Sequence, residues 1–134
     1  MADERAIGDH IAPLVTKAAK EAGRPSPRIV AGIPVALCQS DDVEAARARA
    51  NRVLGHAEYS PNYERLLERG DAATVGDLLA AGDESAVVDR LRTFRDAGAT
   101  DLSFRVLPLG VDRDARIESR RRTEAFLATV GREL

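Results

Sequence analysis

The sequence predicts an α/β fold built on parallel strands, and two observations support this prediction. Nearly every residue from Ile29 to Cys38 is apolar, without the polar alternation of a half-buried strand. Such a strand is covered on both faces, which is typical of parallel sheets in α/β proteins. A second strand pattern follows at 101–107 after a long helical stretch, and this order implies parallel strands. With 134 residues, we expect a single domain over 1–134.

The first expected element is a helix from Glu4 to Ala22, ahead of the apolar strand. Its apolar residues share one face, and Asp3 is available as its N-cap. Pro13 lies inside this pattern, so it either kinks the helix or marks a new start. The strand follows at about 28–37, and Pro34 within it predicts a bulge or a gap in pairing because proline has no amide donor.

The stretch between the two strands is interpreted as helical throughout. The expected helices begin at Ser40 or Asp41 and end near Glu58, then cover Asn62 to Arg69, Thr74 to Ala81, and Glu84 to Ala97 behind a cap at Asp83 or Ser85. After the second strand, a last helix begins at Asp112 or Asp114 and ends near Arg132. This leaves two strands, too few to bury both faces and both edges of the first. We therefore expect further neighbours from another chain, another copy or sequence not present here.

The composition narrows the classes of function. The formal net charge is −2, so the chain has no large basic surface for nucleic acid or anionic membranes. Only 4% of its residues are aromatic and none is tryptophan, so it lacks the usual stacking surface for single-stranded nucleic acid. With 44% hydrophobic and 31% charged residues, the chain is typical of a soluble globular protein. Its one cysteine, Cys38, indicates a reducing compartment, and its polar start does not resemble a signal peptide, so we expect a cytoplasmic location.

Three stretches together resemble a known family. They are SPRIVAGIPVALCQSDDVEAARARAN at 26–51, YSPNYERLLERG at 59–70 and AAGDESAVVDRLRTFRDAGATDLSFRVLPLG at 80–110. Their order and spacing resemble the C-terminal part of the luciferase-like monooxygenase superfamily, most closely its branch of oxidoreductases that use the deazaflavin coenzyme F-420. The resemblance covers Glu4 to Leu134, and no single stretch is a catalytic signature.

The resemblance implies a partial TIM (β/α)₈ barrel, with 29–37 and 101–107 as its last two, parallel strands. By this resemblance, residues 4–22 correspond to the sixth barrel helix and residues 114–132 to the closing helix. The helices between 59 and 81 correspond to a helical insertion of the family. Strands one to six of the barrel are absent. The implied function is hydride transfer or monooxygenation with coenzyme F-420 or FMN. The resemblance also implies that the chain is inactive without the missing strands. The implied partners are a complementary barrel chain or a second copy, with a small-molecule substrate. The alternative is a non-catalytic, oligomeric remnant that acts as a binding or structural module.

The candidate pocket residues follow from the barrel interpretation, in which functional atoms lie at the carboxyl ends of strands and in the loops after them. These candidates are Cys38, Gln39, Tyr59, Tyr63, Arg105, Pro108 and Gly110. Each has a plainer interpretation as a loop, packing or solvated-edge residue. No catalytic residue is assigned.

Other motifs give little support for a site. The two histidines, His10 and His56, have no metal-ligand spacing, and we expect no metal; neither is placed by sequence as a base for Cys38. The glycines form neither a Rossmann nor a P-loop motif. Arginines at 116 and 120–122, interleaved with Glu118 and Glu124, indicate either a solvated helix face or an anion-binding surface.

Overall fold

The fold is centred on a parallel sheet of three strands in the order β2-β1-β3. The structure is a computed structural model that describes residues 1–56 and 60–131. Strand β1 (Val30–Leu37) lies in the middle, between β2 (Ala80–Gly82) and β3 (Asp101–Val106). Both pairings are parallel, with Val35 opposite Ala80 on one side and opposite Val106 on the other. The predicted parallel α/β arrangement is confirmed.

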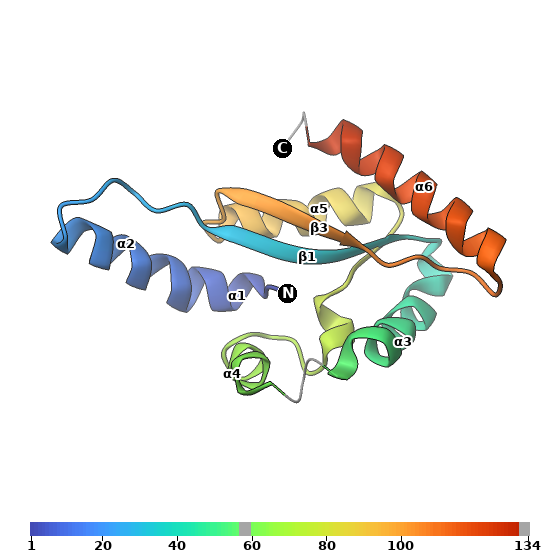
Figure 1. Ribbon diagram of the computed structural model, residues 1–134, viewed down its shortest axis with the longest axis horizontal. Helices are drawn as coiled ribbons and strands as arrows, with labels where there is room; N and C mark the ends of the chain where they lie inside the picture. The colour runs from blue at the N-terminus through green and yellow to red at the C-terminus, as the bar shows by residue number, and fades with distance from the viewer. Residues whose placement is uncertain (57–59, 132–134) are drawn as a thin grey trace.

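Helices cover both faces of β1, which explains its continuous apolar run (Figure 1). The helical elements are α1 (Glu4–Ala6), η1 (Ile7–Ile11), α2 (Ala12–Glu21), η2 (Ser40–Asp42), α3 (Val43–Leu54), α4 (Pro61–Arg69), η4 (Val75–Leu78), α5 (Glu84–Asp96) and α6 (Arg113–Val130). On one face, the odd-numbered residues Ala31 to Leu37 pack against α5 and α6. On the other face, Ala36 packs against Ala46 and Ala50 of α3.

The third strand, β2, corrects the prediction of two strands and of a helix at 74–81. Residues 75–78 form a short 3₁₀ helix, opened by a capping box between Thr74 and Asp77, and the chain then extends into β2. The strand has three residues of sequence Ala-Ala-Gly, which carry neither alternation nor β-branched side chains. The long connection from β1 to β3 therefore contains a strand, with α3, α4 and η4 before β2 and α5 after it.

Pro34 is accommodated by the limited length of β2. In a parallel sheet, successive residues of a central strand direct their backbone N–H and C=O groups alternately toward the strand on one side and the strand on the other. Cys38 donates to the Gly82 carbonyl of β2 at 2.9 Å, whereas the Val35 carbonyl accepts from Leu107 at 2.8 Å on the β3 side. By this alternation, the Pro34 nitrogen faces the β2 side, where pairing begins only at Val35. The predicted gap in pairing lies there.

The N-terminal helix contains the irregularity that Pro13 predicted. Asp3 caps α1 by accepting from the Ala6 amide at 3.0 Å, as expected. A π-helical turn at η1 then precedes α2, in which Pro13 occupies the first turn, so the chain restarts its helix where proline is tolerated. Helix α2 has no buried residue and extends beyond the sheet (Figure 1).

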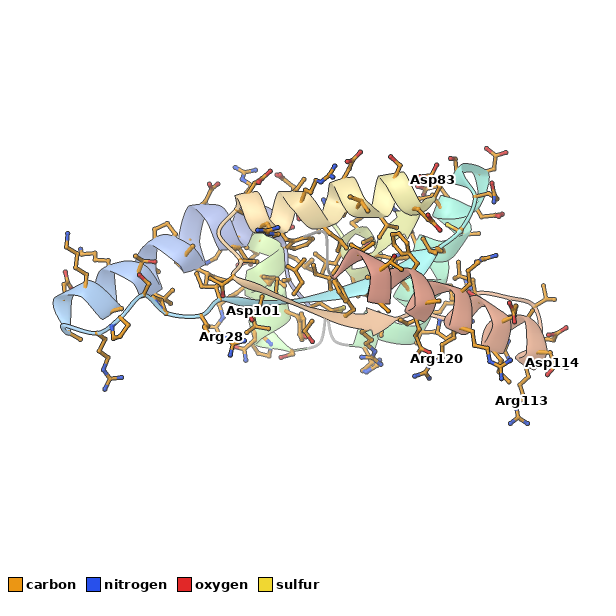
Figure 2. The ribbon with its side chains drawn as sticks, turned by 90° about the horizontal axis from the view of Figure 1, so that it is seen from above. Arg28, Asp83, Asp101, Arg113, Asp114 and Arg120 are labelled. Atoms are coloured by element: carbon orange, nitrogen blue, oxygen red, sulfur yellow. The ribbon has the colours of Figure 1, made fainter. Side chains whose placement is uncertain are left out.

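The last two helices agree with prediction at their N-termini, whereas the helix expected from Ser40 or Asp41 begins as the 3₁₀ turn η2 and continues as α3 without a side-chain cap. Asp83 caps α5 and Asp112 caps α6, each by accepting an amide hydrogen bond from three residues on. Next to the start of β3, Arg28 and Asp101 form an exposed ion pair, and Figure 2 shows them side by side. In the described part of the chain, no helix is long and apolar enough to cross a membrane.

Candidate functional site

The topology creates a crevice at the carboxyl edge of the sheet. The chain leaves β1 toward α3 on one face, whereas it leaves β3 toward α6 on the opposite face. The loops after these neighbouring strands therefore diverge, which is where open α/β sheets bind ligands. We take this crevice as the candidate functional site.

A cavity of about 810 Å³ occupies the crevice. Its volume is within the range of small-molecule pockets, roughly 300–1,000 Å³. The lining residues come from the end of β1 and the loop after it (Leu37, Cys38, Gln39), from the start and body of α3 (Asp42, Ala45, Ala46, Arg49, Arg52), and from the β3–α6 loop and α6 (Leu109, Gly110, Val111, Ala115, Glu118, Ser119, Arg122). The wall is thus partly apolar and partly rich in arginine.

Two buried hydroxyls of α6 fix the walls of the crevice. Ser119 accepts from the Leu109 amide at 3.0 Å, which holds the loop after β3. Thr123, fully buried, accepts from the Leu37 amide at 3.4 Å and donates to the Ser119 carbonyl at 3.0 Å. Because the two strands end against one helix turn, their carboxyl ends keep a fixed spacing.

Two arginines cross the crevice from opposite walls. Arg49 of α3 donates from Nε to the Pro108 carbonyl after β3 at 2.8 Å. Arg122 of α6 donates from Nη2 to the Leu37 carbonyl at the end of β1 at 3.4 Å. Each guanidinium is held by a backbone oxygen, and neither forms an ion pair with any residue of 1–56 or 60–131.

Cys38 lies half-buried in this wall. Burial raises the pKa of its thiol, and the nearby Asp42 carboxylate acts in the same direction. A hydrogen bond with the Gly82 backbone and the Arg122 charge lower that pKa and offset part of the rise. His56 lines a different cavity, so it supplies no base here. The thiol is therefore a protonated, weakly nucleophilic group at neutral pH.

The predicted pocket residues divide among several surfaces. Cys38, Gln39 and Gly110 line the crevice. Tyr63 and Arg105 instead line a cavity of about 330 Å³ beside Gly32 and Pro34, on the sheet face that carries α3. The remaining two candidates are Pro108, which lines a third, open depression, and Tyr59, which lies outside the described residues.

The smaller cavity has its own polar contacts. The Met1 nitrogen donates to the Tyr63 hydroxyl at 2.8 Å, which closes one side. Arg105 is exposed on the same face as Pro34, its register partner in β3 pairing. Arg105 lies near the carboxyl end of β3 and also lines the third depression with Pro108, but neither Arg105 nor Tyr63 lines the crevice. Tyr63 and Arg105 therefore do not join Cys38 in one site.

Sequence reasoning missed the helical residues of the crevice, Arg49, Arg52 and Ser119. The basic run that includes Arg122 gave a signal, but only the fold shows that Arg122 lines the cavity while Arg121 does not. In the described ranges, no group of three or more His, Cys, Asp or Glu side chains is arranged to hold a metal ion.

The comparisons with known proteins give one partial structural likeness. No family model matches the sequence, and no curated protein matches it significantly. A solved structure described as an F420-dependent secondary alcohol dehydrogenase in complex with an F420-acetone adduct superposes with a TM-score of 0.53 at 19% sequence identity. The match covers 78% of this chain and 35% of that chain, so this chain spans about a third of that protein. It is a partial match to a TIM-barrel enzyme of the luciferase-like family, and at this identity it concerns the fold alone.

Proposed function

We propose that this chain is the C-terminal portion of a coenzyme F-420- or flavin-dependent luciferase-like oxidoreductase, and that its crevice forms one wall of the coenzyme pocket. The supporting observation is the coincidence of two findings. The chain superposes on part of an F420-dependent dehydrogenase, and a cavity of about 810 Å³ lies at the carboxyl ends of its parallel strands.

The lining residues fit such a coenzyme in kind. Leu37, Ala46 and Leu109 offer an apolar wall for a flat ring, and Arg49 offers carbonyl or phosphate oxygens the N–H donors that have no partner in the described part of the chain. When bound, the coenzyme supplies the hydride chemistry. The residues of this chain hold and orient it and exclude water on one side, and none is assigned a proton-transfer step.

The proposal includes a partner. The outer edge of β3 is unpaired in the described sheet, since β3 pairs with β1 alone. Edges of parallel sheets are normally covered by further strands or helices. We infer that a complementary barrel chain, or a second copy of this chain, completes the sheet along that edge and supplies the rest of the pocket.

Fluorescence titration with coenzyme F-420 and with FMN tests this function. We expect saturable quenching by at least one of them, for this chain alone or with a complementary chain, and weaker binding when Ala45→Arg fills the crevice, because Ala45 is an exposed residue of its lining. Ala48→Arg on the exposed side of α3 is the matched control. Absence of binding to either coenzyme under both conditions would remove the enzyme proposal.

The alternative is a non-catalytic oligomeric module, and exposed apolar residues favour it. Leu14 on α2 is 54% exposed and Val30 at the start of β1 is 58% exposed. Neither side chain contributes to the crevice. If the chain binds no coenzyme but self-associates through these residues in sedimentation experiments, and Leu14→Gln with Val30→Thr abolishes the association, the module is the better description.

A further inference from the structure

We propose that the crevice contains a subsite for a phosphate group, formed by the guanidinium groups of Arg49 and Arg122. The inference rests on the side chains of the crevice and stands whether or not the chain takes part in redox chemistry. Its ligand class is a small molecule that carries a phosphate group.

The first argument is the way the two arginines are held. Each has five N–H donors, and each uses one on a backbone carbonyl at the end of a strand, Pro108 for Arg49 and Leu37 for Arg122. These contacts reach across the crevice from α3 to the loop after β3 and from α6 to β1. The two guanidinium groups are thus positioned in advance while most of their donors have no partner among residues 1–56 and 60–131, an arrangement suited to the tetrahedral oxygens of a phosphate.

The second argument concerns charge. Arg49 and Arg122 are among the basic residues that form no ion pair within residues 1–56 and 60–131, although Asp42 and Glu118 line the same cavity. Arg52 adds a third guanidinium to the lining, which leaves three cations against two carboxylates.

The third argument is position. The cavity lies where two helices, α3 and α6, begin at the carboxyl edge of the sheet, and its lining includes Asp42 at the N-cap of α3 and Ala115 in the first turn of α6. Helix N-termini add partial positive charge to the field of the arginines. The same walls contain Cys38, the single thiol of the chain, beside Arg122. A ligand bound between the arginines therefore lies next to a group that reports its presence.

The test uses the full chain and inorganic phosphate as the probe. Alkylation of Cys38 by iodoacetamide is followed while phosphate replaces potassium chloride at constant ionic strength. We expect saturable slowing, because bound phosphate obstructs the thiol and neutralises Arg122. The Arg49→Gln/Arg122→Gln variant should weaken the apparent affinity about tenfold or more, as expected for loss of charge-assisted hydrogen bonds. Arg121→Gln, which removes the neighbouring charge outside the cavity, should bind phosphate like the parent.

Folding of each variant is checked by circular dichroism. If the double variant is unfolded, Arg122→Gln alone carries the test, since its backbone contact is the longer of the two. Unchanged phosphate affinity in a folded variant that lacks Arg122, or no slowing beyond that of chloride in the parent, would overturn the subsite.

The source of the phosphate is separated by comparing FMN with riboflavin, which lacks it. Arginine-dependent protection of Cys38 by FMN but not by riboflavin assigns the subsite to the coenzyme. Protection by phosphate without binding of FMN or F-420 supports the subsite and removes the proposed oxidoreductase. Coenzyme binding without arginine-dependent protection of Cys38 by phosphate supports the oxidoreductase and removes the subsite.

Discussion

The two faces of β1 are covered in different ways. On the face toward α5 and α6, large side chains such as Ile33, Leu91 and Phe94 form one continuous cluster. On the face toward α3, Ala36 belongs to a smaller cluster, and Pro34 lines a cavity that is open to solvent. The difference indicates that one face provides most of the apolar stabilisation, while the other leaves room for a ligand or a further element.

The largest expected effect is on the densely packed face. Phe94 is fully buried against the central strand, and Phe94→Ala removes its ring without solvent access to relax the void. We expect the free energy of unfolding to fall by about 3–5 kcal/mol. Urea unfolding followed by circular dichroism measures it. A loss near 1 kcal/mol would mean that this face is not the main core.

A matched truncation probes the other face. Leu54 is buried at the end of α3 and lines the smaller cavity beside Tyr63. Because Leu54→Ala enlarges a space that water already enters, we expect a loss of about 2 kcal/mol, at the low end for leucine. The same urea series gives the value. A loss equal to that of Phe94→Ala would remove the proposed asymmetry between the faces.

A smaller effect is expected at the hydroxyl that joins α6 to the end of β1. Thr123→Val keeps the shape of the side chain but leaves the buried Leu37 amide without its acceptor. We expect a loss of about 1–2 kcal/mol. Thr123→Ser, which retains the hydroxyl, is the control and should keep the contact with Leu37. If both variants lose the same amount, the hydrogen bond contributes little.

The smallest effect is expected at the exposed pair of Arg28 and Asp101. Hydrogen bonding from Arg28 is the main cause that lowers the pKa of Asp101 to about 2. The pKa of an aspartate in the unfolded chain is about 4. Because the pKa of Asp101 is lower in the folded state, its carboxylate stabilises the fold at a pH above about 4, and this contribution is lost as the pH falls through the folded-state pKa. Asp101→Asn should therefore lower the urea midpoint slightly at neutral pH and not at about pH 2.

Salt provides the control for this pair. Both side chains are solvent-accessible, so 1 M salt should remove most of the difference between the parent and Asp101→Asn. A difference that persists at low pH or in high salt would mean that Asp101 acts through something other than its charge.

The sequence was sufficient where local chemistry decides the structure. The unbroken apolar run identified β1, because only a strand covered on both faces lacks alternation. Asp3 was correctly identified as a cap, because an acceptor before an apolar helix satisfies its first amides. Cys38, Gln39 and Gly110 were correctly placed at one sheet edge, since the carboxyl ends of parallel strands lie together; their role as pocket residues remains a prediction.

The sequence was insufficient where contacts between distant segments decide. Strand β2 is too short and too rich in alanine to be distinguished from a helix, and it exists because it pairs with β1. Arg49 and Ser119 lie on separate helices, so their meeting at the crevice depends on α3 and α6 covering opposite faces of the sheet. Arg105 was predicted either to face the pocket or to lie at a solvated edge, and the structure places it exposed beside a different cavity, because the face that it takes depends on contacts a six-residue strand does not reveal.

The ring nitrogen of Pro34 has a consequence for assembly. An additional strand could pair with the first half of β1, Val30 to Ile33, on the side where β2 lies. At Pro34 this strand would meet a residue without a backbone N–H to donate. Such a strand must stop or bulge there and cannot continue in line with β2. An incoming chain on that flank is thereby confined to a short pairing, whereas the free edge of β3 carries no proline and can accept a longer one.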